Sequence, residues 1–315
     1  MKLQSIFTAS VAAIALFAGG PAIAQQSTPA PVEEEKVLAA DKEMDESAGS
    51  PALWKVADED TTIYLFGTVH MLPDDVEWYT GAIKDALASS GTLVTEIDMN
   101  PEKAQAMGQL VATKGMLTDG QTLRGLMDEE QLAVFEAGLA KIGVPAAAFD
   151  TMEPWLASIA MVQIVSQASG FDESKGVETV LESVVSEGTK RVALETVEFQ
   201  ISVFDELPIE QQILFMLETA EDPLAAITML NELVSVWAAG EPEKLGAMMN
   251  EGFMAHPNLG ERLLYQRNEN WAEWIDTRLD EPGTVFIAVG AGHLAGERSV
   301  QDYLATRDIE TTRVQ

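Results

Sequence analysis

Short runs of β-branched and other apolar residues alternate with long amphipathic segments from residue 52 onward, and this alternation constrains the fold most. Four of the runs have the length and composition of β-strands: residues 61–66, 92–95, 191–194 and 284–289. The first and last are almost continuously apolar, which is typical of strands covered on both faces of a sheet. We therefore expect an α/β fold in which helices flank a central, mostly parallel or mixed sheet.

The segments between these runs carry apolar residues at helical spacing and have helix-starting residues at their beginnings. Helices are expected over residues 74–90, from Pro101, after Asp128, and over residues 154–165, 177–185, 209–218 and 224–239. Most of the chain between residues 100 and 187 is then helical. The sequence thus predicts a helical middle region between the second and third strands.

The N-terminal part has the organisation of an exported protein. Lys2 precedes an apolar stretch over residues 6–17, and Ala22-Ile23-Ala24 supplies a small-x-small cleavage pattern, so residues 1–24 are expected to be a signal peptide. Residues 25–51 are rich in acids, contain several prolines and lack aromatic residues, which predicts a disordered acidic linker. The folded α/β domain would then span residues 52–315. We expect cleavage near Ala24, a periplasmic or secreted location, and no stable membrane insertion afterwards.

Charge and cysteine content exclude several classes of function. The chain has 51 acidic and 19 basic residues and a formal net charge of −32. Phosphate backbones repel such a protein, so we expect no nucleic-acid partner. The chain has no cysteine, which excludes disulfides, cysteine-ligated zinc or iron–sulfur centres, and a thiol nucleophile.

Each of the four predicted strands ends at residues that can carry chemistry. Gly67-Thr68-Val69-His70 follows the first strand, and Gly290-Ala291-Gly292-His293 follows the fourth, so both are followed by G-x-x-H. The second and third strands end at Glu96 and Glu195. Functional groups gather beyond the carboxyl ends of parallel strands, so these four side chains should converge if the strands are neighbours. The third histidine, His256, is expected in a loop.

Imidazole and carboxylate side chains are ligands for Mn²⁺, Co²⁺, Zn²⁺ and Fe²⁺. We therefore predict that His70, His293 and one glutamate, with Glu96 favoured, hold a divalent metal cation. Glu195 is then the favoured general base that activates water, although the roles of the two glutamates could be exchanged. Each of these residues could instead have a structural role.

Arg267 lies where a charge is unexpected. It shares a helical stripe with the apolar residues Leu263, Trp271 and Ile275, so it should point toward the domain. A buried guanidinium needs a carboxylate or an anionic ligand. Arg267 could pair with a structural acid, extend to water, orient a site glutamate or bind a substrate carboxylate. The adjacent Asn268 could form hydrogen bonds in the same place.

Taken together, these motifs resemble the TraB/GumN family, which includes the Tiki metalloproteases. The matching segments follow one another along the whole predicted domain: residues 53–56, 64–70, Glu96, 176–178, 194–196 with Gln200, Arg267-Asn268 and 290–294. The third residue of the segment 176–178 is Glu178, where the family usually has Asp.

The resemblance implies an α/β fold with both G-x-x-H motifs at one site and, through the Tiki members, a metal-dependent peptidase. We therefore expect an exported, metalloprotease-like hydrolase for a peptide or small-molecule substrate, with Glu195, Arg267 and Asn268 in catalytic roles. The alternative is a non-catalytic exported binding protein for haem, a metal or a small anion, because a related group binds haem. The oligomeric state stays open.

Overall fold

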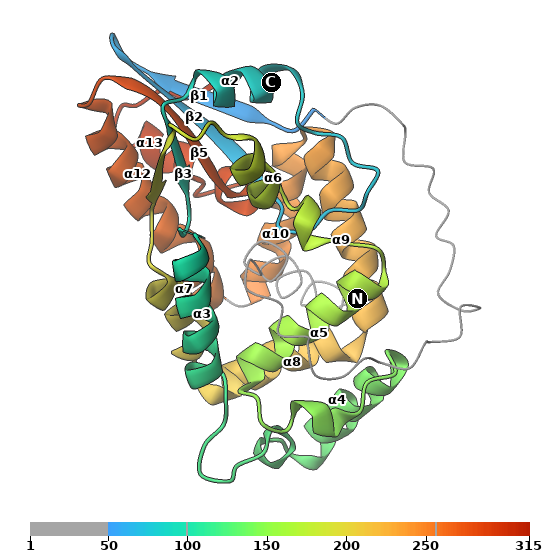
Figure 1. Cartoon of the computed structure of the whole chain (residues 1–315). Helices are drawn as coiled ribbons and strands as arrows, with labels where there is room; N and C mark the ends of the chain where they lie inside the picture. The colour runs from blue at the N-terminus through green and yellow to red at the C-terminus, as the bar shows by residue number, and fades with distance from the viewer. Residues whose placement is uncertain (1–49, 99, 256) are drawn as a thin grey trace.

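The computed structural model describes residues 50–98, 100–255 and 257–315 (Figure 1). The predicted signal peptide, nearly all of the predicted linker and the loop expected at His256 lie outside the described residues. None of the helices in the described ranges combines the length and apolarity needed to cross a membrane.

The described chain forms a six-stranded mixed sheet with the strand order β4-β3-β5-β2-β1-β6. Its strands are β1 (Leu53–Ala57), β2 (Thr61–Thr68), β3 (Thr92–Thr95), β4 (Lys190–Ala193), β5 (Gly283–Gly290) and β6 (Thr312–Arg313). The four predicted strands correspond to β2, β3, β4 and β5, and they are parallel neighbours. Strands β1 and β6, which the sequence did not predict, pair antiparallel beyond β2. The predicted α/β fold with a mixed sheet is confirmed.

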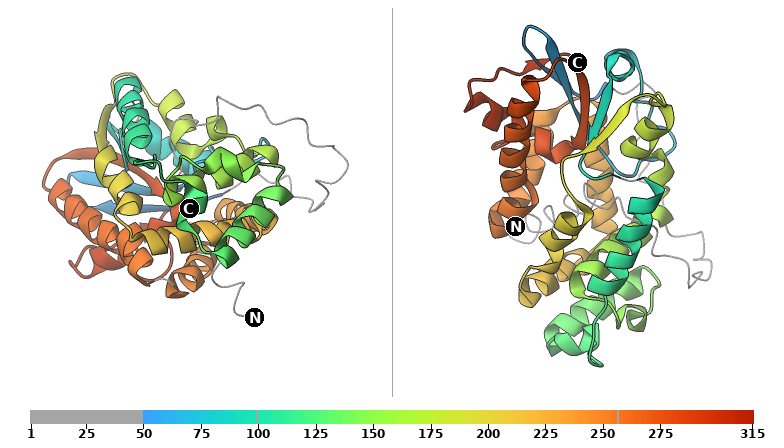
Figure 2. Two further views of the ribbon diagram at one scale, coloured as in Figure 1. Left: turned by 90° about the horizontal axis from the view of Figure 1, so that it is seen from below. Right: turned by 60° about the vertical axis from the view of Figure 1, so that its left-hand side comes forward.

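Strand β5 is apolar throughout because both of its faces are covered. Val285, Ile287 and Val289 pack in one core cluster with residues of α12 (Gln266–Leu279) and α13 (Val300–Ala305). The alternate residues Phe286 and Ala288 belong to another cluster on the opposite face, with α2 (Gly81–Ser89), α6 (Val177–Val184) and α9 (Pro223–Ala238). Figure 2 shows helices on both faces of the sheet.

The predicted helical middle region is also confirmed. It contains α3 (Pro101–Lys114), α4 (Glu129–Lys141), α5 (Pro154–Ala168) and α6, and it is followed by α7 (Val197–Asp205), α8 (Ile209–Glu221), α9, α10 (Pro242–Ala255) and α11 (Pro257–Gly260). Helices α4, α5 and α8 form a separate apolar cluster around Phe135, Met161 and Met216. In Figure 1 this cluster lies at the end of the molecule remote from the sheet.

Helix starts follow the local sequence, with one exception. Asp128 caps α4 through a capping box with Gln131. The exception is α2, which begins at Gly81 and not at Asp74 as predicted. In the segment before α2, Trp78 is buried and stacks on Phe66 with ring centroids 5.6 Å apart. The packing of this side chain in the core takes the place of the predicted first helical turns.

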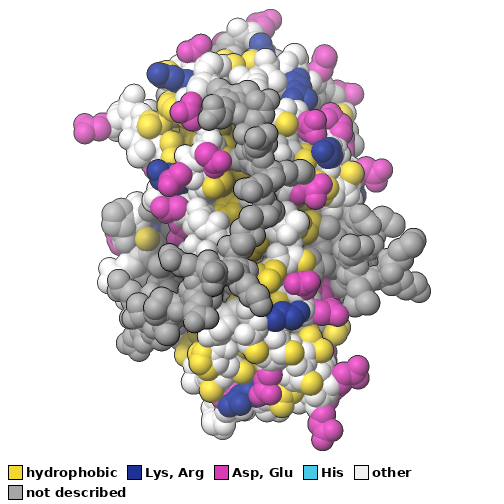
Figure 3. Space-filling view, turned by 90° about the vertical axis from the view of Figure 1, so that its right-hand side faces the viewer, with side chains coloured by type: hydrophobic (Ala, Val, Ile, Leu, Met, Phe, Trp, Pro, Cys, Tyr) yellow, Lys and Arg dark blue, Asp and Glu magenta, His cyan; other side chains and the backbone are white. Residues whose placement is uncertain are grey.

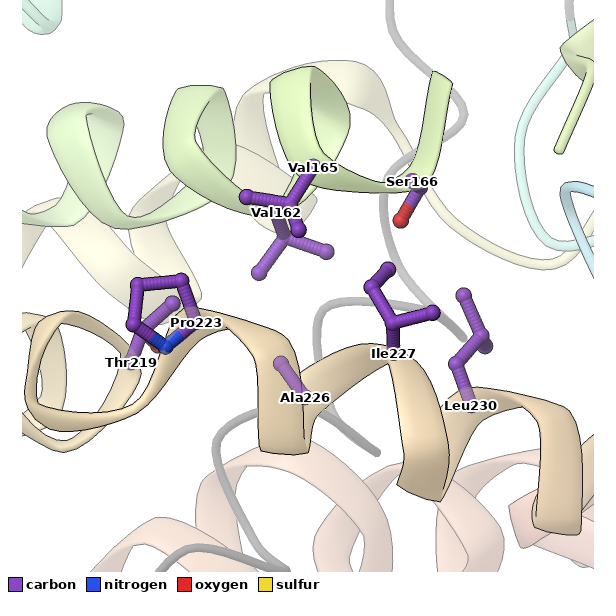
Figure 4. Close-up of a pocket in the computed structure, with 8 residues that line it drawn as sticks. All are labelled: Val162, Val165, Ser166, Thr219, Pro223, Ala226, Ile227 and Leu230. Atoms are coloured by element: carbon purple, nitrogen blue, oxygen red, sulfur yellow. The ribbon is translucent and has the colours of Figure 1, made fainter. Parts of the chain in front are cut away.

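A narrow crevice separates α5 from α9 (Figure 4). It is lined mostly by apolar side chains, among them Val162, Ala226 and Leu230, but the hydroxyl of Ser166 is buried there without a hydrogen-bond partner among the described residues.

The outer surface is predominantly acidic. Figure 3 shows acidic side chains scattered over the face it presents, with few basic ones between them, as the net charge of −32 leads one to expect.

Candidate functional site

The two G-x-x-H segments pack directly on each other. Both begin in the last residues of adjacent parallel strands, β2 and β5. Gly67 makes this approach possible, because a Cβ atom at that position would lie 2.9 Å from the Cα atom of Ala291 in the second motif. The indole nitrogen of Trp237 donates a hydrogen bond of 2.8 Å to the carbonyl oxygen of Gly67 and holds the first turn in place.

Arg267 lies among the predicted site residues and is 1% exposed. Its Nε and Nη2 atoms donate to the two carboxylate oxygens of Glu195 at 2.7 and 2.8 Å. Nη2 also donates to Glu96 at 2.6 Å, while Nη1 donates to the carbonyl oxygen of Leu263 and lies 3.2 Å from Nε2 of His293. The expectation that Arg267 points inward and pairs with a strand-end acid is therefore confirmed, and it pairs with both.

The charges of this cluster depend on one another. Burial alone would lower the pKa of Arg267, but the charges of Glu96 and Glu195 outweigh that effect and raise it, so the guanidinium stays cationic. Burial also raises the pKa of Glu195, and Arg267 offsets only part of that rise. The indole nitrogen of Trp271 adds a hydrogen bond of 3.0 Å to Glu195.

Glu96 is engaged through both carboxylate oxygens. Oε1 accepts the backbone N–H of Gly290 at 2.7 Å. Oε2 accepts the amide of Gln200 at 2.8 Å, in addition to the bond from Arg267. Because Gly290 begins the second G-x-x-H motif, Glu96 connects the end of β3 to that motif.

Asn268 determines which nitrogen of His293 carries the proton. The amide nitrogen of Asn268 donates to the carbonyl oxygen of Arg298 at 2.8 Å, so its amide oxygen faces Nδ1 of His293 at 2.5 Å. An amide oxygen only accepts, hence Nδ1 bears the hydrogen and the lone pair of Nε2 faces Arg267. Burial, reinforced by the charges of Arg267 and His70, holds the pKa of His293 well below its usual value.

An unusual backbone segment supports Asn268. A π-helical turn, Glu261–Tyr265, leads directly into α12, and such turns recur at functional sites. Arg298 has a left-handed backbone conformation with φ of 57°, which is uncommon for a residue other than glycine. Its guanidinium forms two hydrogen bonds with Glu261, at 2.8 and 2.9 Å, and lies 4.0 Å from the ring centre of Tyr265. These contacts hold in place the carbonyl group of Arg298, to which Asn268 donates its hydrogen bond.

His70 contacts a different acid. Its Nδ1 atom lies 2.8 Å from Glu178, and the hydroxyl of Thr68 donates to the same carboxylate oxygen. Glu178 is in the first turn of α6, and Val177 of the same turn donates its N–H to the carbonyl oxygen of Val69 at 2.9 Å. The charge of a protonated His70 contributes to the lowered pKa of His293.

The structure thus brings five of the six predicted site residues into one hydrogen-bonded cluster: Glu96, Glu195, Arg267, Asn268 and His293. We call this the Arg267 cluster. The contact described for His70 is with Glu178. No group of three or more His, Asp or Glu side chains is arranged to hold a metal ion within the ranges that the structure describes. The assignment of His70, Glu96 and His293 as ligands stays a prediction.

Sequence reasoning did not assign roles to Gln200, Trp271, Thr68 and Glu178. Gln200 and Glu178 lie in segments that carry the family resemblance, and Thr68 lies inside the first G-x-x-H motif. Trp271 belongs to the same helical stripe as Arg267. The hydrogen bonds of these four residues to the site depend on tertiary structure, so their residue types alone could not indicate those bonds.

Comparison with known proteins gives one result. A model of the TraB/PrgY/gumN family matches residues 52–313, which include the whole sheet, both G-x-x-H motifs and every residue of the Arg267 cluster. Searches of curated proteins and of solved structures gave no match.

Proposed function

The chain belongs to the TraB/PrgY/gumN family, and from this premise we propose that it is an exported metal-dependent hydrolase of the peptidase type. One observation carries the proposal. Two histidine motifs pack on each other at the carboxyl edge of parallel strands, beside two buried glutamates that share one arginine. A site with imidazoles, carboxylates and a fixed cation has the groups that hydrolysis of an acyl bond requires.

The chemistry of the donors fits a divalent cation in part. Nε2 of His293 carries a lone pair, and its Nδ1–H is held by Asn268, as is usual for metal-binding histidines. Nη1 of Arg267 lies 3.2 Å from this Nε2, so His293 would have to exchange that contact to bind a cation. Both oxygens of Glu96 already have partners, so this residue would have to exchange one of them to become a ligand. We propose His70 and His293 as the main ligands and Glu96 as the third. A bound cation would polarise the scissile carbonyl and lower the pKa of a water molecule.

The protein's own groups would divide the remaining tasks. Burial raises the pKa of Glu195 toward the range in which a carboxylate accepts protons effectively, so we assign it the role of general base. Arg267 holds both oxygens of Glu195 and so fixes the direction from which a proton can be taken. Asn268 keeps the imidazole of His293 in one orientation.

The test starts from mature protein purified from the exported fraction. We expect elemental analysis to find a divalent metal, and a peptide mixture to be cleaved in a reaction that a chelator abolishes. His70→Ala and His293→Ala should lose metal and activity. Because His293 is fully buried, His293→Ala should also be less stable, so circular dichroism is used to show that each variant is folded. Arg124→Ala, whose side chain pairs with Asp150 outside the Arg267 cluster, is the control and should keep metal and activity.

Two outcomes would count against the proposal. Protein without metal and without cleavage would refute it. Retained metal or haem without cleavage would support the alternative, a non-catalytic exported binding protein for haem, a metal or a small anion.

A further inference from the structure

We infer that Glu178 is a positioning residue for His70: its carboxylate holds the imidazole as the Nδ1–H tautomer, so that Nε2 carries the lone pair. The task of Nε2, to bind a metal or to accept a proton, rests on the proposed function. The tautomer itself follows from the contacts of the described residues and can be tested without any activity.

The carboxylate oxygen next to His70 is an acceptor. It accepts the hydroxyl of Thr68 and lies 2.8 Å from Nδ1 of His70. An ionised carboxylate has no hydrogen to donate, so a bond of this length requires the hydrogen to be on Nδ1. In neutral imidazole the other nitrogen is then the acceptor. In both His70 and His293, Nε2 would thus carry the lone pair, although Nδ1 is bonded to a carboxylate in His70 and to an amide oxygen in His293.

The backbone around Glu178 is built to keep it there. Gly176 precedes α6, and a Cβ atom at this position would lie 2.0 Å from the carbonyl oxygen of His70. Only glycine therefore allows the start of α6 to approach the first G-x-x-H motif so closely. The bond from Val177 to Val69 ties the same two segments together. The carboxylate is aligned by its backbone as well as by its side-chain partners.

A purely structural role explains Glu178 poorly. Its second oxygen, Oε2, is buried and has no hydrogen-bond partner among the described residues. Leaving such an oxygen unpaired is unfavourable for stability, and a residue retained for stability would normally have both oxygens satisfied. The loss of stability from the unpaired Oε2 is explained if Glu178 is needed at this place to fix the tautomer of His70.

Glu173 offers a matched control. It is a second acid within electrostatic range of His70, but it accepts its hydrogen bond from Gln163 at 3.1 Å. Removing Glu173 takes away the same charge from the same neighbourhood and leaves the bond between Glu178 and His70 in place. A difference between the two variants therefore reports the bond and not the charge.

The experiment is ¹⁵N–¹H correlation spectroscopy of the imidazoles in metal-free mature protein, at a pH where they are neutral. Signals of His70 are assigned by their loss in His70→Ala. We expect the Nδ1–H tautomer in the wild type, in Glu173→Ala and in Glu178→Asp, which keeps a carboxylate. In Glu178→Ala we expect His70 to shift toward the Nε2–H tautomer that imidazole prefers in water. The His293 signals should not change and thereby show that the fold is intact.

Two results would overturn the inference: a wild-type His70 in the Nε2–H form, or a Glu178→Ala variant with an unchanged tautomer. Metal and peptide assays address the separate question of function. If the proposed function holds, Glu178→Ala should lower metal affinity or kcat by about 10–100-fold with little change in KM. If the wild type binds no metal and cleaves nothing, the proposed function fails, and the spectra still decide the role of Glu178.

Discussion

Replacing Arg267 by Ala should be among the most destabilising single substitutions in this protein. The side chain is 1% exposed, and its partners Glu96 and Glu195 are 8% and 6% exposed. Removing one member of a buried ion pair costs about 3–5 kcal/mol, because the remaining charge stays desolvated. Here two carboxylates lose their shared cation at once, so we expect the free energy of unfolding to fall by at least about 3–5 kcal/mol.

Arg267→Lys tests the geometry of the guanidinium. An ammonium keeps the charge but cannot give the two parallel hydrogen bonds that Glu195 receives. Losing one bond to a charged group costs about 1.5–3 kcal/mol, so this variant should lie between the wild type and Arg267→Ala. Arg124→Ala is the surface control. Arg124 also forms two bonds with one carboxylate, that of Asp150, but it is 38% exposed, so its removal should matter much less.

The loss of unfolding free energy in Arg267→Ala should also depend on pH, and it should be smaller at lower pH. Burial already raises the pKa of Glu195, and without Arg267 that pKa rises further. Between the ordinary pKa of a glutamate and this raised value, the folded state binds more protons than the unfolded state. Stability relative to the wild type should therefore increase as the pH falls from 7 toward 5.

Urea unfolding followed by circular dichroism and tryptophan fluorescence measures these differences. At a slope of about 3 kcal/mol per M, the expected loss for Arg267→Ala moves the urea midpoint by about 1–1.7 M at pH 7. A variant within about 0.5 kcal/mol of the wild type, the range of ordinary surface substitutions, would refute the reasoning. So would a deficit that is the same at pH 7 and pH 5.

Three further predictions concern the surroundings of the site. Gly67→Ala should lower stability by about 1–3 kcal/mol in the same urea experiment and impair any activity, because its Cβ would clash with the backbone of Ala291. Gly188→Ala, with open space around its Cβ position, is the control and should be neutral. Because the pKa of His293 is lowered in the folded state, its contribution to stability is complete above about pH 6.5 and falls by up to about 1.4 kcal/mol per pH unit below that, as far as the folded-state pKa. In unfolding curves from pH 7 to 5, His293→Gln should lack this part of the slope, and an identical slope would contradict the assignment. Ser166→Ala removes a buried hydroxyl without a partner, so calorimetry should find it neutral or more stable by up to about 1 kcal/mol, and a clear loss would point to a hidden hydrogen bond.

The central parallel strands and the inward position of Arg267 could be predicted, because each depends on a local pattern. Strands β2 and β5 are long and apolar, and the helical stripe around Arg267 has one charged member. Strand β1 has a charged residue, Lys55, in its middle, and β6 has two residues, so neither forms the continuous apolar run by which a strand is predicted from sequence.

Contacts that depend on tertiary backbone geometry could not be predicted. The left-handed conformation of Arg298 places a carbonyl group beside Asn268, and no residue type requires that conformation there. Similarly, His70 finds its carboxylate partner in a helix more than one hundred residues later in the chain, and only the folded structure shows which acid that is.

The position of β5 has a consequence for the order of folding. This strand comes from residues 283–290, near the C-terminus, yet it lies between β3 and β2 in the middle of the sheet. A ribosome releasing the chain from its N-terminus would deliver β2, β3 and β4 long before the strand that joins them. The sheet has high contact order, and its halves cannot unite until residues 283–290 arrive. A chain that ended before β5 would leave unpaired the edges of β2 and β3 that β5 covers, and such edges are sites for aggregation and for recognition by chaperones.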